Sequence, residues 1–69
     1  MAGDRHWRGT SNLARLAKQQ PAETREKWGL ELVPEASDRY GLFWRSRDAV
    51  VLARGATVQA WVATDAQQP

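Results

Sequence analysis

The sequence contains no cysteine and only one histidine. Without cysteine the chain forms neither disulfide bonds nor a thiolate metal site, which is compatible with a reducing compartment, so we expect a cytoplasmic protein. The one histidine, His6, is too few for a typical metal site. A catalytic nucleophile needs a base to activate it, and His6 lies in the expected N-terminal arm. Glycine-rich phosphate loops are also absent. We therefore expect a protein that is not an enzyme and that uses no cofactor or metal.

Long apolar runs are missing as well. No stretch approaches the roughly 18 apolar residues that a membrane-spanning helix needs, and residues 1–10 lack the apolar core of a signal peptide, so no membrane partner is expected. The chain has 69 residues, and a chain of this size buries only about 60% of its unfolded surface, which limits it to one domain. We expect a flexible basic arm at residues 1–9, a single small domain at 10–64 and a frayed tail at 65–69.

The N-terminal part of the domain has helical periodicity. In residues 12–20, NLARLAKQQ, the apolar side chains fall on one helical face, and Thr10 or Ser11 can cap this helix. Pro21 ends the first helix and suits the first position of a second one, which Gly29 terminates. The pattern predicts two short helices within about residues 11–28.

After Gly29 the sequence becomes rich in valine, threonine and aromatic residues, which is typical of strands. A polar turn is expected after Pro34, and an antiparallel β-meander or wing within about residues 40–64. The overall prediction is an α+β fold. The segment RDAVVLAR, residues 47–54, has an alternative, because Ser46 is a good N-cap for a short helix there. Its adjacent valines favour a strand.

Arginine accounts for eight of the ten basic residues. Arginine binds phosphate through two parallel hydrogen bonds and stacks on aromatic rings, so this composition suits a nucleic-acid partner. A GC-rich genome produces the same bias, however, and the net charge of +2 is small for a strong nucleic-acid binder. The basic excess lies within residues 1–28.

Four tryptophans are a large number for so short a chain. Trp28 and Trp61 are expected in the core, because a small domain needs large side chains to bury enough apolar area. Trp7 falls in the expected arm. Trp44 follows Phe43 in a strand, where neighbouring residues point to opposite faces, so one of these two rings points outward.

An outward aromatic ring at this point would lie beside Arg45 and Arg47. Such a ring can stack on a nucleic-acid base, and it can equally anchor a protein interface, where tryptophan and arginine are both enriched. The sequence leaves both alternatives open.

The run LARLAKQQPAETREKW, followed by LELVPEASDRYGLFWRSRDAVVL, resembles the small phage excisionases and the MerR-like winged-helix proteins. These proteins have a short helix-turn-helix with a recognition helix, a two-stranded wing, and a segment similar to F-x-x-S-x-D-x-V that leads into a third helix. The resemblance implies recognition-helix positions at Thr24, Arg25 and Lys27. It also places Arg39 and Arg45 on the wing, with Trp28 packed inward.

Our first hypothesis is a small bacterial or phage DNA-binding protein of the excisionase or repressor type, which regulates transcription. One module of this size buries only about 600–1,000 Å² against DNA, so it would act as a homodimer or beside another protein. Its expected nucleic-acid-binding residues are Arg15, Lys18, Arg25, Lys27, Arg39, Arg45 and Arg47. The alternative is a protein-binding inhibitor or adaptor with a hot spot formed by Phe43, Trp44 and Arg45.

Overall fold

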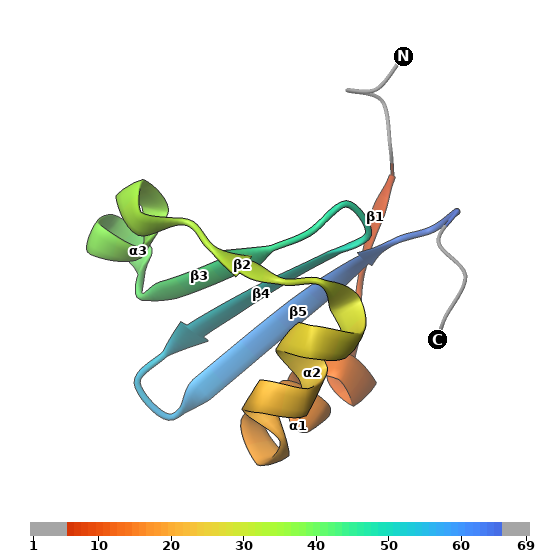
Figure 1. Ribbon diagram of the computed structural model, residues 1–69, viewed down its shortest axis with the longest axis horizontal. Helices are drawn as coiled ribbons and strands as arrows, with labels where there is room; N and C mark the ends of the chain where they lie inside the picture. The colour runs from red at the N-terminus through yellow and green to blue at the C-terminus, as the bar shows by residue number, and fades with distance from the viewer. Residues whose placement is uncertain (1–5, 66–69) are drawn as a thin grey trace.

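The computed structural model describes residues 6–65, which form an α+β fold with three helices and one five-stranded antiparallel sheet. The strand order is β1-β5-β4-β3-β2, so the first and last strands of the chain lie side by side (Figure 1). The elements in chain order are β1 (Trp7–Gly9), α1 (Ser11–Gln19), α2 (Pro21–Trp28), β2 (Glu31–Leu32), α3 (Pro34–Tyr40), β3 (Leu42–Arg45), β4 (Ala49–Arg54) and β5 (Thr57–Ala63). The predicted fold class is confirmed.

The first two helices begin and end at the residues that the sequence indicates. Thr10 has an extended backbone, and its hydroxyl oxygen accepts a hydrogen bond of 3.5 Å from the Leu13 N–H, which caps α1. Pro21 is the first residue of α2, a position where a backbone N–H would have no partner within the helix. Gly29 ends α2 in the left-handed conformation, with φ at 66°. These local signals explain why the two helices could be predicted.

The short helix α3 stands where a polar turn was expected. The Ser37 hydroxyl donates to the Val33 carbonyl at 2.8 Å and accepts a hydrogen bond of 2.9 Å from the Phe43 N–H. An isolated helix of seven residues is unstable in water, so α3 depends on this tie to β3. The prediction that helix is confined to residues 11–28 is therefore wrong.

Strand β1 replaces part of the expected arm. Its three residues pair with β5, and the Thr64 N–H donates to the His6 carbonyl at 2.9 Å. The prediction of an arm is wrong for residues 6–9, because a three-residue strand at the sheet edge is defined by its partner and has no periodicity of its own. Residues 1–5 of the expected arm, and residues 66–69 of the expected tail, lie outside the described residues.

Residues 49–54 form a strand, which decides between the two alternatives for this segment. A two-residue turn, Gly55–Ala56, joins β4 to β5, and Gly55 has a φ of 59°. A turn with positive φ at its first central residue matches the right-handed twist of the two strands, which favours this hairpin.

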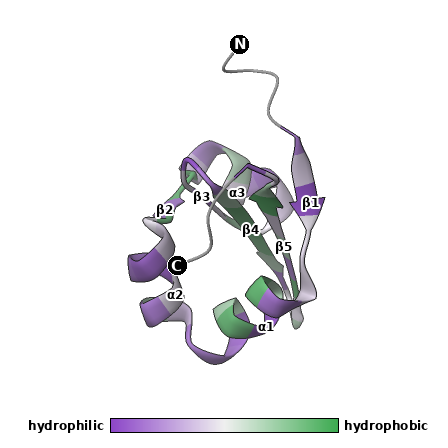
Figure 2. Cartoon of the chain, turned by 90° about the vertical axis from the view of Figure 1, so that its right-hand side faces the viewer, coloured by the Kyte–Doolittle hydropathy of each residue, from purple (hydrophilic) through white to green (hydrophobic). Residues whose placement is uncertain are grey.

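The core lies between the sheet and the first two helices. Figure 2 shows α1 and α2 on one side of the sheet. Alternate residues of the strands point toward these helices, and the others point to the opposite face. The buried apolar side chains of this core are Leu13, Leu30, Ala49, Val51, Ala60 and Val62.

The tryptophans divide between the two faces of the sheet. Trp28 and Trp44 are half-buried and pack against the core, as the resemblance implied for Trp28. Trp61 is half-buried on the opposite face, where a Cβ atom on Gly9 would lie 3.7 Å from its indole ring. The prediction that Trp61 belongs to the core is wrong. The helices cover the face of β5 that bears Ala60 and Val62, so the alternation along the strand turns Trp61 away from them.

Candidate nucleic-acid interface

One row of side chains crosses the sheet face that α1 and α2 leave uncovered, which we call the open face. Gly9, Trp61, Val50, Arg45 and Glu31 are successive partners across all five strands. Residues directly opposite each other on paired strands point to the same side of the sheet, so these residues share the open face.

A second row on the open face contains Gln59, Leu52 and Phe43. Trp7 lies beside these rows on β1, where it pairs with Ala63. The apolar side chains of Phe43 and Leu52 are only half-buried, and Trp7 is 42% exposed. The open face therefore presents aromatic and aliphatic groups to the solvent.

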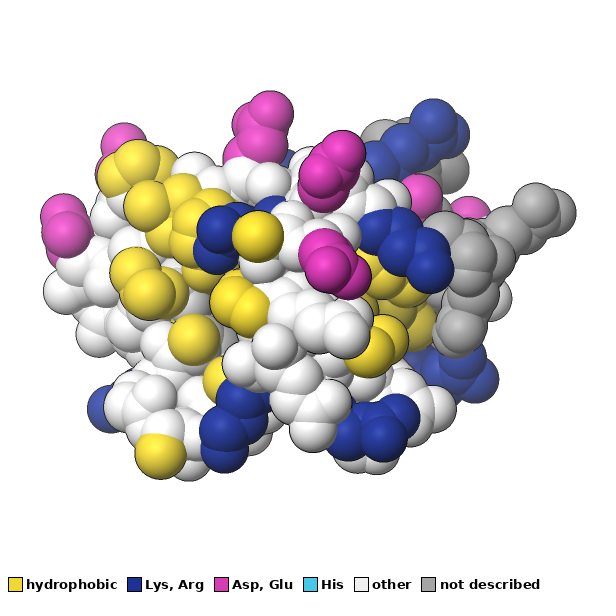
Figure 3. All heavy atoms as spheres, turned by 60° about the horizontal axis from the view of Figure 1, so that its bottom comes forward, with side chains coloured by type: hydrophobic (Ala, Val, Ile, Leu, Met, Phe, Trp, Pro, Cys, Tyr) yellow, Lys and Arg dark blue, Asp and Glu magenta, His cyan; other side chains and the backbone are white. Residues whose placement is uncertain are grey.

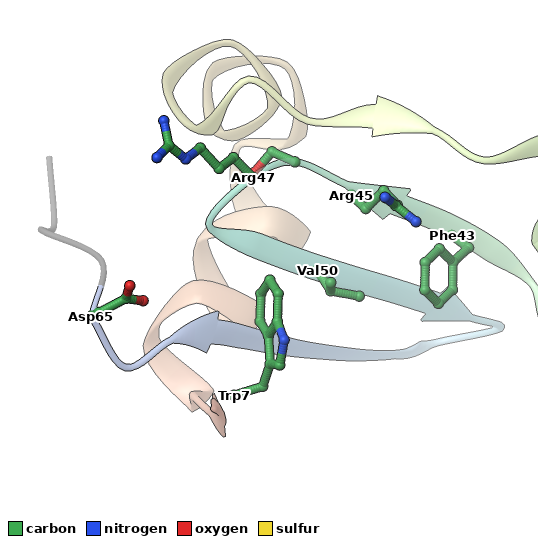
Figure 4. Close-up of a pocket in the computed structure, with 7 residues that line it drawn as sticks. Trp7, Phe43, Arg45, Arg47, Val50 and Asp65 are labelled. Carbon is green, nitrogen blue, oxygen red and sulfur yellow. The ribbon is translucent and has the colours of Figure 1, made fainter. Parts of the chain in front are cut away.

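A hollow of about 630 Å³ lies on this face near the turn between β3 and β4. Figure 4 shows the rings of Trp7 and Phe43 on either side of Val50, with Arg45 and Arg47 along one rim. The residues that line the hollow are Trp7, Phe43, Arg45, Ser46, Arg47, Val50 and Asp65. They come from β1, β3 and β4, from the turn between β3 and β4, and from the segment that follows β5.

The turn between β3 and β4 is held by Ser46. Its hydroxyl oxygen accepts hydrogen bonds from the N–H groups of Asp48 at 3.3 Å and Ala49 at 3.1 Å, and its own N–H donates to the Ala49 carbonyl at 2.8 Å. A side chain that bonds to nearby backbone in this way stabilises a tight turn. The backbone that bears Arg45 and Arg47 is therefore fixed by the same serine.

The charged lining of the hollow consists of two guanidinium groups and one carboxylate. Arg45 and Arg47 are exposed, and Asp65 is the acidic residue. Arg54 is also exposed on the open face, but it lies at the far end of β4 and does not line the hollow. Clustered cations at the edge of an apolar surface attract anionic groups such as phosphates.

The other basic residues predicted to bind nucleic acid lie away from this hollow. Arg15 and Lys18 are exposed on α1, Lys27 is exposed on α2, and Arg39 is exposed in the last turn of α3. Arg25 is half-buried, and its guanidinium carbon lies 4.7 Å from the centroid of the Trp44 ring. The structure therefore gathers only Arg45 and Arg47 of the seven predicted residues.

Helix α2 has few of the features that a recognition helix needs. Thr24 is buried, with 6% of its surface exposed, so its implied role in DNA contact is wrong. The exposed charged side chains of α2 are Glu23, Glu26 and Lys27, and carboxylates repel DNA phosphates. The third helix that the resemblance implies after Asp48 is also wrong, because that segment is β4.

Phe43 and Trp44 point to opposite faces, as the alternation of a strand requires. Phe43 lies on the open face with Arg45, whereas Trp44 lies on the helix-covered face beneath Arg25. The hot spot predicted from Phe43, Trp44 and Arg45 is therefore divided between two surfaces. Trp7 and Val50 were not predicted as neighbours of Phe43. No local pattern indicates that β1 pairs with β5, or in which register β4 pairs with β3.

Within residues 6–65 no three His, Asp or Glu side chains gather in a way that could hold a metal ion. None of the helices in this range has the length and apolar character needed to cross a bilayer. Comparison with models of known families, with curated proteins and with solved structures finds no match.

Proposed function

We propose that this protein is a non-enzymatic nucleic-acid-binding protein, and that its open face binds single-stranded DNA or RNA. The observation that supports this proposal is the placement of two aromatic rings, Trp7 and Phe43, and two arginines, Arg45 and Arg47, around one hollow. Aromatic side chains bind unpaired bases by stacking, and arginines bind the phosphates that join them.

The shape of the site favours single strands over duplexes. Bases in a duplex are stacked on each other, so a ring on a protein surface reaches them only when they are unpaired. A helix that enters the major groove is the common way to read a duplex, and the exposed side of α2 contains two glutamates. The proposed partner is therefore still a nucleic acid, in the expected cytoplasmic setting. Of the contacts expected on the helices and the wing, only those of Arg45 and Arg47 on the sheet side are kept.

Replacing Arg45 and Arg47 together by alanine is expected to weaken binding and to reduce its dependence on salt. Each lost phosphate contact lowers the slope of log affinity against log salt by about 0.7 for a single strand, so two contacts give a change of up to about 1.4. Fluorescence anisotropy of a labelled oligothymidylate at several salt concentrations measures this slope.

The matched control replaces Arg15 and Lys18 by alanine, which removes the same charge from α1 on the other side of the sheet. We expect the control to leave the slope close to that of the wild type. An equal change in both double variants would contradict the proposal, because it would mean that the helices contact the nucleic acid as much as the open face does.

A further inference from the structure

A second hollow, the apolar groove, lies on the helix-covered side of the sheet. It has a volume of about 130 Å³, several times the roughly 30 Å³ of a water molecule in the liquid. This is space for one large apolar side chain. The groove is lined by residues of the helices α1 and α2 and of the strands β3, β4 and β5. Its walls include Ala17, Pro21, Leu42, Trp44, Ala53 and Val58.

Large apolar side chains surround the groove and remain exposed. Leu42 is 53% exposed, and Leu32, which is the partner of Trp44 across β2 and β3, is 39% exposed. Figure 3 views the molecule from below the orientation of Figure 1. Hydrophobic side chains, in yellow, gather at the upper left of this view, with a basic side chain among them. Contiguous apolar surface of this kind is typical of sites that bind another molecule.

Arg25 gives the groove a charge. Its guanidinium group lies over the Trp44 ring in the wall of the groove, and no carboxylate from the described residues pairs with it. A guanidinium group has five N–H donors, and these suit a carboxylate. The groove is thus complementary to an apolar side chain with a carboxylate beside it.

We propose that the apolar groove binds a short acidic, amphipathic segment of a partner protein. A large apolar side chain of the segment fills the groove beside Trp44, and a neighbouring carboxylate pairs with Arg25. This interaction surface lies on the opposite side of the sheet from the open face, and it does not depend on what the open face binds.

Two short synthetic peptides test the proposal. They share a pair of leucines at helical spacing and differ in one adjacent residue, which is glutamate in the first peptide and glutamine in the second. The indole N–H signal of Trp44 in the ¹H–¹⁵N spectrum of the whole chain reports on the groove. We expect the glutamate peptide to shift this signal with an affinity about tenfold higher than the glutamine peptide, because a hydrogen bond to a charged group is worth that much.

Two variants make the test specific. Arg25→Gln is expected to remove the preference for the glutamate peptide, and Leu42→Ser, at an exposed position, is expected to weaken both peptides alike. The remaining amide signals show that each variant is folded. Equal affinities of the two peptides for the wild type, or no shift of the Trp44 signal, would overturn the proposal. A Trp44 signal that moves with protein concentration alone would also overturn it, because a second copy would then fill the groove.

Discussion

The double variant Trp7→Ala, Phe43→Ala is expected to bind single-stranded DNA about 30-fold or more weakly than the wild type. Stacking of a base on an aromatic ring is worth about 1–3 kcal/mol by alanine substitution, so two lost rings remove at least about 2 kcal/mol. The two rings lie on either side of Val50 in the same hollow, which allows a single strand to contact both. Anisotropy titration with labelled oligothymidylate at one salt concentration measures the change.

Tyr40→Ala is the matched control for this experiment. Tyr40 is an aromatic residue with 53% of its surface exposed, and it ends α3, outside the hollow. We expect this control to bind as the wild type does. If the double variant kept the wild-type affinity while its urea midpoint showed it to be folded, the open face would not be the binding surface.

Gly41→Ala is expected to lower the free energy of unfolding by about 2–6 kcal/mol. Gly41 has a φ of 105°, and a Cβ atom at this position would lie 2.6 Å from the Ala53 carbonyl oxygen. The backbone conformation alone costs a residue with a side chain about 1–3 kcal/mol, and forcing an extra methyl group into packed structure costs a further 1–3 kcal/mol or so. Gly41 immediately precedes β3, so the strain would also disturb the strand that presents Phe43 and Arg45.

Gly29→Ala separates these two contributions. Gly29 has a φ of 66°, but nothing lies within 4 Å of the position of its Cβ atom. The expected loss is therefore the conformational part alone, about 1–2 kcal/mol. Equilibrium unfolding in urea compares the two variants. Equal midpoints would mean that β4 does not approach Gly41 as closely as the structure has it.

The elements that could be predicted from the sequence are those fixed by neighbouring residues. The caps of α1 and α2 lie next to the helices that they end, and the alternation within β4 and β5 is visible along each strand. By contrast, β1 and α3 depend on residues far along the chain. β1 exists through its pairing with β5, and α3 is held by the hydrogen bonds between Ser37 and Phe43.

The candidate site was predictable only in part, for a related reason. The segment from Phe43 to Arg47 indicated an aromatic ring flanked by arginines, and the hollow contains Phe43, Arg45 and Arg47. Alternation required that Phe43 and Trp44 point to opposite faces, but it could not tell which face the helices cover. Trp7 joins the site only through the pairing of the first strand with the last, which has no local signature.

The four tryptophans provide the most direct test of the central claim, because two lie on each side of the sheet. Trp7 and Trp61 lie on the open face, and Trp28 and Trp44 lie on the helix-covered side. Each indole N–H gives its own signal in a ¹H–¹⁵N spectrum, which can be followed while oligothymidylate is added. We predict that the signals of Trp7 and Trp61 shift and that those of Trp28 and Trp44 do not. Shifts confined to Trp28 and Trp44, or no shift of any indole signal, would contradict the claim that the open face binds single-stranded nucleic acid.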